Sequence, residues 1–132
     1  MFSLFKVIKN KKGFTLVELI VVMAVLAIIS AIAVPRFLGV QEKAREDADY
    51  ATGAMIAKAA ELYEAKENYS EPTITADVLV TDGYLSDVKF KTDMFKECAL
   101  SDIQITYDEG AISVDALNIT GQTGPVALYP RP

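Results

Sequence analysis

The chain lacks most of the side chains from which catalytic and cofactor sites are built. Its 132 residues include no histidine, no tryptophan and a single cysteine, Cys98. No glycine-rich phosphate loop is present, which excludes the motif-based zinc sites, nucleophile–base triads and nucleotide sites. One cysteine cannot form an internal disulfide, and a buried, inert thiol is its commoner state, with a cross-link between chains as the alternative. We predict a protein that is not an enzyme, with no cofactor and no metal.

Positive charge is scarce beyond the N-terminus. The chain has 13 basic and 18 acidic side chains, a formal net charge of −5. Without the four lysines of the first 13 residues, nine basic and eighteen acidic side chains remain and the net charge is −9. A chain this acidic is not expected to bind nucleic acid through its overall field. The four leader residues are Lys6, Lys9, Lys11 and Lys12.

One apolar run dominates the sequence. It extends from Phe14 to Val34 and is broken only by three polar residues, Thr15, Glu18 and Ser30. At about 1.5 Å per residue a helix of this length spans roughly 30 Å, the thickness of a hydrocarbon core. Because the basic leader precedes the run, the positive-inside rule keeps the N-terminus in the cytoplasm and sends the rest across the membrane. We predict a single-pass membrane segment.

A cleaved secretory signal peptide is the alternative for this run. Ala31-Ile32-Ala33 has the small-x-small pattern of a signal peptidase site. However, the run is longer than a signal-peptide core of about 7–15 residues, and Glu18 lies inside it. These two features favour the spanning segment.

The junction before the run resembles a known processing signal. Gly13-Phe14-Thr15-Leu16-Val17-Glu18, followed by an apolar helix and Pro35, is similar to the class III signal of type IV prepilins and type II secretion pseudopilins. The resemblance covers the leader and the first helix. It implies that a prepilin peptidase cuts between Gly13 and Phe14 on the cytoplasmic side and methylates the new amine of Phe14. It also implies a membrane assembly platform and other pilins as partners.

Glu18 is the one carboxylate in the apolar run. A charge at the centre of a spanning helix costs about 2.5–3.5 kcal/mol and therefore needs a partner. The amine that cleavage creates at Phe14 would lie one helical turn away, within the chain or on a neighbouring copy. We interpret Glu18 as the residue that sets the assembly register. The alternative is a carboxylate that snorkels to the lipid headgroups.

The helix is expected to continue beyond the membrane as far as Asn68. The segment from Phe37 is rich in alanine, the best helix former. Pro35 removes one backbone hydrogen bond and predicts a kink, either a simple bend at the membrane exit or a point that loosens on extraction. Gly53 weakens the helix locally. An apolar stripe with a spacing of three and four is expected to face a sheet: Val40, Ala44, Ala48, Ala51, Met55, Ala59 and Leu62.

The remainder predicts a small β-rich head. Thr75–Leu85 is expected to form a short helix with Thr75 as its N-cap and Gly83 at its end. Alternating residues on both sides of Asp108-Glu109-Gly110 predict a β-hairpin. Val126–Tyr129 is expected to form the last strand. The predicted fold class is α+β, a long N-terminal helix, spanning in its first half and amphipathic in its second, packed on a small antiparallel sheet.

Three surface features of the head keep two interpretations each. Asp102, Asp108, Glu109 and Asp115 lack a calcium-loop spacing, and a solvated strand edge is favoured over a calcium site. Lys89, Phe90, Lys91, Phe95 and Lys96 are interpreted as a strand with lysines toward water rather than a contact for DNA, sugar or a subunit. Aromatic residues at helical spacing indicate packing rather than electron transfer; they are Phe14, Phe37, Tyr50, Tyr63 and Tyr69.

These observations predict a structural protein in three parts. Residues 1–13 form a cleaved leader, residues 14–34 the spanning and assembly half of the helix, and residues 35–132 the head. The expected function is that of a type IV pilus subunit, which waits in the cytoplasmic membrane and then joins a surface filament of copies of itself. A pseudopilin of a type II secretion or DNA-uptake system is the alternative. A monomeric, membrane-anchored binding module is a further one.

Overall fold

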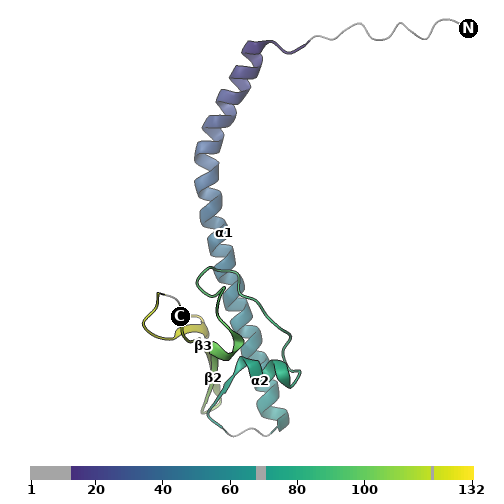
Figure 1. Cartoon of the computed structure of the whole chain (residues 1–132), viewed down its shortest axis with the longest axis vertical. Coiled ribbons are helices and arrows are strands. Elements are labelled where there is room, and N and C mark those ends of the chain that lie inside the picture. Colours follow the sequence, from purple (N-terminus) through teal and green to yellow (C-terminus); the bar gives the residue numbers. More distant parts are fainter. Residues whose placement is uncertain (1–12, 68–70, 120) are drawn as a thin grey trace, which may run out of the picture. The chain divides into compact units, whose positions relative to one another are not determined.

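The computed structural model describes residues 13–67, 71–119 and 121–132. The chain divides into two compact units, Met1–Gly39 and Val40–Pro132. A single helix, α1 (Leu16–Glu67), contributes residues to both units, and a four-stranded antiparallel sheet belongs to the second. Figure 1 shows the long helix α1 and labels α2, β2 and β3 of the second unit. The predicted α+β class, with a long N-terminal helix and a small antiparallel sheet, is confirmed.

The first unit is an apolar helix whose side chains face outward. Among the described residues, α1 is the one helix long and apolar enough to cross a membrane, with a mean hydropathy of 2.9 over its most apolar 18-residue window. None of that window is buried within the chain. The helix continues through Pro35 without ending. Its observed bounds lie within two residues of the predicted start at Phe14 and the predicted end at Asn68.

The sheet of the second unit is built from strands that follow one another in the chain. They are β1 (Thr73–Thr75), β2 (Ile103–Asp108), β3 (Ala111–Ala116) and β4 (Val126–Tyr129), in the spatial order β1-β2-β3-β4. The predicted hairpin is β2–β3, with Ile105 opposite Val114. Its two turn residues, Glu109 and Gly110, both have positive φ, as a tight hairpin turn requires.

Two short helices complete the second unit, α2 (Ala76–Thr81) and a 3₁₀ turn, η1 (Leu100–Asp102). Thr75 occupies the N-cap position of α2 as predicted, but its hydroxyl makes no capping hydrogen bond. The backbone of Thr75 instead belongs to β1 and pairs with Gln104 of β2. Gly83 follows α2 with φ of +79°, in agreement with the predicted end of this helix.

The core of the second unit lies between one face of α1 and the sheet. Ile56 of α1, Leu79 of α2, and Ile103, Ile105, Val114 and Leu128 of the sheet are almost completely buried. Gly53 brings α1 close to β4, because a Cβ atom at this position would lie 2.6 Å from the carbonyl oxygen of Leu128. Gly53 is therefore a packing requirement, and not only the local weak point that the sequence predicted.

The predicted apolar stripe of α1 does not face the sheet. Of its seven residues only Ala59 is buried and Ala48 half-buried, whereas Val40, Met55 and Leu62 are exposed. The buried face is centred about 100° away, one residue further round the helix. It consists of Asp49, Gly53, Ile56, Ala57, Ala59, Ala60 and Tyr63. The prediction missed this face because a hydrophobic pattern does not count Asp49 and Gly53 as core residues.

The segment with the lysines and phenylalanines is a loop, and the predicted strand over it is wrong. Residues 85–99 contain turns but no strand. Phe90 and Phe95 both turn into the core, with ring centroids 5.6 Å apart. Lys89, Lys91 and Lys96 remain exposed, as expected. The aromatic residues of this patch are therefore structural and are not displayed for a ligand.

Candidate functional site

The start of α1 is organised around Thr15 and Glu18. The Glu18 carboxylate accepts hydrogen bonds from the Thr15 backbone N–H (2.8 Å) and from the Thr15 hydroxyl (3.0 Å). In return, the Thr15 hydroxyl oxygen accepts one from the Glu18 backbone N–H (3.2 Å). This is a capping box, in which the residue before the helix and the third helical residue satisfy each other's backbone donors. A carboxylate in the first turn is also favoured by the helix dipole.

Sequence reasoning assigned Glu18 the amine of Phe14 as its partner, within the chain or on a neighbouring copy, and missed Thr15. The pattern Thr-x-x-Glu before an apolar run was sufficient to predict the capping box. Glu18 can cap the helix and still pair with an amine, because a carboxylate has acceptor sites for more than the hydrogen bonds that Thr15 donates. Thr15 is thus a further residue of the site, and it holds the Glu18 carboxylate at the helix start.

The expected cleavage position lies immediately before this box. Gly13 and Phe14 precede the first helical residue, and both are exposed, with the Phe14 side chain 91% accessible. Among the described residues other than Phe14, no atom lies within 4 Å of the position that a Gly13 side chain would occupy. The bond between Gly13 and Phe14 lies before the first helical residue, Leu16, and is exposed in the described part of the chain. The leader lysines Lys6, Lys9, Lys11 and Lys12 lie outside the described residues.

Beyond Glu18 the helix offers apolar side chains and almost nothing else. The large apolar residues from Leu16 to Val34 are each between 50% and 73% exposed. Phe37 and Leu38, which follow the predicted membrane exit at Pro35, are exposed as well. Removing apolar surface from water is favourable by about 25 cal/mol per Å², so such a surface is stable only in lipid or against other apolar surfaces. The first unit therefore needs an apolar environment that its own chain does not supply.

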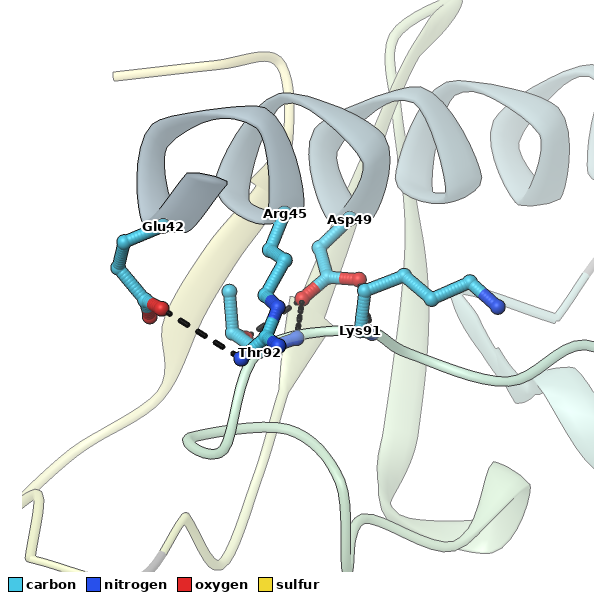
Figure 2. Close-up of polar contacts among 5 residues, drawn as sticks. All are labelled: Glu42, Arg45, Asp49, Lys91 and Thr92. Atoms are coloured by element: carbon cyan, nitrogen blue, oxygen red, sulfur yellow. Dashed lines mark hydrogen bonds and ion pairs between the residues drawn. The ribbon is translucent and has the colours of Figure 1, made fainter. Parts of the chain in front are cut away.

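In the second unit, a buried carboxylate fastens the loop to the helix. Asp49 of α1 is 1% exposed and accepts hydrogen bonds from the backbone N–H groups of Lys91 (2.6 Å) and Thr92 (2.8 Å). The Thr92 hydroxyl donates a third, at 2.5 Å. Figure 2 shows this cluster, with the Glu42–Arg45 ion pair one turn earlier on the helix. Buried charge is tolerated here because three donors point at it.

Two side-chain contacts hold the C-terminal tail against α1. The Arg131 guanidinium forms an ion pair with Asp47 (2.7 Å) and lies over the Tyr50 ring, 4.5 Å from its centroid. These contacts hold the residue beyond β4, whereas β4 itself is held by its pairing with β3. Tyr50 thus packs as predicted for the helix aromatics, as does Tyr63, whose ring meets that of Tyr84 edge-on at 5.3 Å.

The thiol of Cys98 lies near the carboxylate of Asp102 in the second unit. Cys98 is half-buried, and burial, with a smaller contribution from Asp102, raises the pKa of its thiol. Asp102 itself accepts hydrogen bonds from the Ala99 backbone N–H and from Asn118. In the described part of the chain, no group of three or more histidine, cysteine, aspartate or glutamate side chains could hold a metal ion.

Comparison with known proteins finds similarity in the region of this site. Residues 8–34 match the prokaryotic N-terminal methylation motif. The chain is 35% identical over 60 residues to the type IV wide pilus major component PilA4 of Thermus thermophilus, covering 46% of either chain. It is 34% identical over 76 residues to prepilin peptidase-dependent protein A of Clostridium perfringens, covering 57% of this chain and 54% of that one.

The chain thus spans about half the length of the curated relatives it matches. No solved structure matches it. The matched motif contains the open Gly13–Phe14 bond, the Thr15–Glu18 capping box and the exposed apolar helix up to Val34. The chain thus carries the prokaryotic N-terminal methylation motif over residues 8–34 and is similar over part of its length to a type IV pilus component and to a prepilin peptidase-dependent protein.

Proposed function

We propose that this protein is the structural subunit of a type IV pilus, made as a precursor in the cytoplasmic membrane. A prepilin peptidase removes residues 1–13 by cutting after Gly13, and the new amine of Phe14 is methylated. The observation that carries the proposal is the motif over residues 8–34 on a helix whose apolar side chains have no cover within their own chain. The open Gly13–Phe14 bond is the place where a peptidase would act.

The membrane stage follows from the charges around the helix. Lys6, Lys9, Lys11 and Lys12 hold the N-terminus on the cytoplasmic side, where the peptidase and the assembly platform would meet it. The second unit then lies across the membrane, with Arg36 at the interface. Because methylation retains the positive charge of the amine, Phe14 stays able to pair with a carboxylate after processing. Pro35 would give the helix a point of bending at the membrane exit.

Assembly transfers the apolar helix from lipid to a bundle of equivalent helices. During this transfer an unpaired Glu18 would carry a desolvation cost of several kcal/mol, whereas the methylated amine of a neighbouring Phe14 would offset it. Only one axial stagger brings the two charges together, so the pair sets the register between copies. Thr15 keeps the carboxylate at the helix start before a neighbour arrives.

The fibre yield of a Glu18→Ala variant tests this proposal against its alternatives. We expect the variant to reach the membrane at the wild-type level but to form few or no filaments, because the neighbour's amine loses its partner. Glu18→Gln is the matched control for size and should fail in the same way. A monomeric binding module predicts that localisation and partner binding stay unchanged and that the wild-type chain forms no filaments.

The fibres of the wild-type chain and the effect of deleting the protein separate the pilus from the pseudopilus. Long surface fibres that contain the wild-type chain support the pilus. A pseudopilin of a secretion or DNA-uptake system predicts instead a secretion or transformation defect on deletion, with no long fibres. The N-terminal motif is shared by both kinds of subunit.

A further inference from the structure

One hollow on the surface of the second unit concentrates positive charge. It lies between α1 and the loop of residues 85–99, with a volume of about 460 Å³, and three of its lining side chains are cations: Arg45, Lys91 and Lys96. Asp93 contributes a carboxylate to the lining. Five basic residues and one acidic residue precede Val40, so the second unit as a whole has eight basic and 17 acidic side chains. The hollow is therefore a positive site on an acidic unit.

The cations of this hollow are weakly compensated by the rest of the chain. Within residues 13–67, 71–119 and 121–132, the ammonium groups of Lys91 and Lys96 form no ion pair, and Arg45 meets Glu42 at 3.7 Å in an exposed pair that contributes little. The backbone of Lys91 is nevertheless fixed, because its N–H donates to the buried Asp49 carboxylate at 2.6 Å. Figure 2 shows Arg45 on α1 and Lys91 on the loop next to this carboxylate. The fold thus holds positive charge in place without pairing it.

The hollow is close along the chain to the expected membrane exit. Gln41 and Arg45 of its lining follow Val34, the last residue of the apolar run, by seven and eleven positions in the same helix. At 1.5 Å per residue these positions lie at most about 10 and 16 Å beyond the hydrocarbon core, and any tilt of the helix lowers this height. The headgroup layer itself is roughly 5–7 Å thick, and charges interact over about 8 Å at physiological ionic strength. Headgroups are therefore within reach of these cations, whose long side chains extend toward such a surface.

We propose that this hollow binds the phosphate group of an anionic phospholipid, in the membrane leaflet that faces the second unit, while the subunit waits for assembly. The inference rests on the membrane stage of the proposed function. Phosphate oxygens accept charge-assisted hydrogen bonds from arginine and lysine, and Arg45, Lys91 and Lys96 supply both kinds of donor. Ala44 and Ala48, small and apolar, line the same hollow and leave room for the glycerol backbone of the lipid.

A nucleic acid or a free anion is a poorer occupant. The acidic surroundings of the hollow repel an extended polyanion, whereas a lipid headgroup brings a single phosphate. The membrane anchor also keeps the hollow next to lipid, so even a weak site meets a high effective concentration of headgroups. A free phosphate ion has no such advantage.

The site would act before assembly and not after it. Bound lipid holds the hollow of the precursor at the membrane surface. Extraction of α1 into a filament takes the hollow away from the leaflet, so the lipid stays behind and Lys91 and Lys96 return to water. The contact is therefore a property of the waiting subunit that the assembly platform has to break.

Acetylation of lysine side chains in the full-length chain in nanodiscs tests the inference. When phosphatidylglycerol is mixed into phosphatidylcholine nanodiscs, Lys91 and Lys96 should be acetylated about fivefold more slowly than in phosphatidylcholine alone, as read by peptide mass spectrometry. Lys43 is the matched control, because it is exposed at the same height on α1 but does not line the hollow. It should slow by at most about twofold, the effect of the surface potential alone. Equal slowing of all three lysines, or none, would overturn the inference.

Two added anions identify the source of the phosphate. Inorganic phosphate or a short DNA duplex, added to phosphatidylcholine nanodiscs, should leave the acetylation of Lys91 and Lys96 unchanged. Protection by either one that equals the protection by phosphatidylglycerol would overturn the assignment to lipid.

Substitution gives a second readout that needs no filament. A variant with both Lys91→Gln and Lys96→Gln should retain at least about fivefold less phosphatidylglycerol than the wild-type chain in native mass spectrometry of protein released from mixed nanodiscs. Lys43→Gln should retain the wild-type amount. Equal retention by the double variant, in a chain that forms fibres, contradicts the lipid site alone. A wild-type chain that retains the lipid but forms no fibres contradicts the proposed pilus and leaves the lipid site standing.

Discussion

In the Val40–Pro132 unit, side chains such as Ile56, Leu79 and Ile105 are buried by the chain itself, whereas the large apolar side chains from Leu16 to Val34 in the first unit are at least half exposed. The second unit also satisfies its buried polar groups internally, as Asp49 illustrates. The first unit has one polar arrangement, the Thr15–Glu18 box, at its very start. The second unit therefore buries its own core, whereas the first unit requires lipid or neighbouring chains.

The largest effect on the self-sufficient unit is expected from Asp49→Ala. The substitution leaves two backbone N–H groups and the Thr92 hydroxyl without their acceptor, at a cost of about 3 kcal/mol. In detergent micelles, the melting temperature of the second unit of the full chain should fall by more than about 10 °C. Asp93→Ala, at an exposed carboxylate of the same loop, is the control and should change little. An unchanged melting temperature for Asp49→Ala would show that the loop is held by other contacts.

Gly53→Ala should have the next largest effect. The added methyl would lie 2.6 Å from the Leu128 carbonyl oxygen and 2.8 Å from its Cβ atom, so α1 and β4 must separate. Overpacking of this kind costs about 1–3 kcal/mol and outweighs the better helix propensity of alanine. Gly39→Ala, on the same helix with no atom within 4 Å, is the matched control and should not destabilise the second unit. A more stable Gly53→Ala variant would contradict the close helix–strand contact.

Asp49 and Gly53 lie in the part of the fold that the sequence predicted less well. The hairpin and the last strand were predictable because turn residues and alternation are local signals, as Glu109 and Gly110 show. The membrane length of the helix was predictable from hydropathy alone. The face of α1 that meets the sheet was not, because alanines occur on both faces and the contact depends on Gly53 and Asp49. The partners of Asp49 and Arg131 are separated from them by more than 40 residues, and no local pattern indicates them.

Arg131→Ala should have a smaller effect, of about 1 kcal/mol on the free energy of unfolding, because an exposed ion pair and a cation–π contact are lost together. Lys58→Ala removes an exposed ion pair within the helix and serves as the comparison, with a smaller cost. The loss from Arg131→Ala should shrink in high salt, which screens the Asp47 pair. Equal effects of the two substitutions would show that the tail gains nothing from its position over Tyr50.

The smallest effect concerns the reactivity of Cys98. Because burial raises the pKa of its thiol, alkylation of the folded protein near neutral pH should be slower than that of the unfolded chain. A raised pKa for an acid means that folding is favoured below the unfolded pKa and that this contribution is lost as the pH rises through the folded value. As the pH rises, the alkylation rate of the folded protein should therefore reach its plateau at a higher pH than the rate of the unfolded chain. Equal rates in both states would contradict the half-buried position.

The central claim is that the apolar half of α1 is processed at Gly13–Phe14 and then covered by equivalent helices. Intact-mass analysis of protein sheared from the cell surface tests it most directly. We expect a chain that begins at an N-methylated Phe14 and retains every residue after it. A native chain that still carries its leader, or one cut after Ala33 near the end of the apolar run, would show that the claim is wrong.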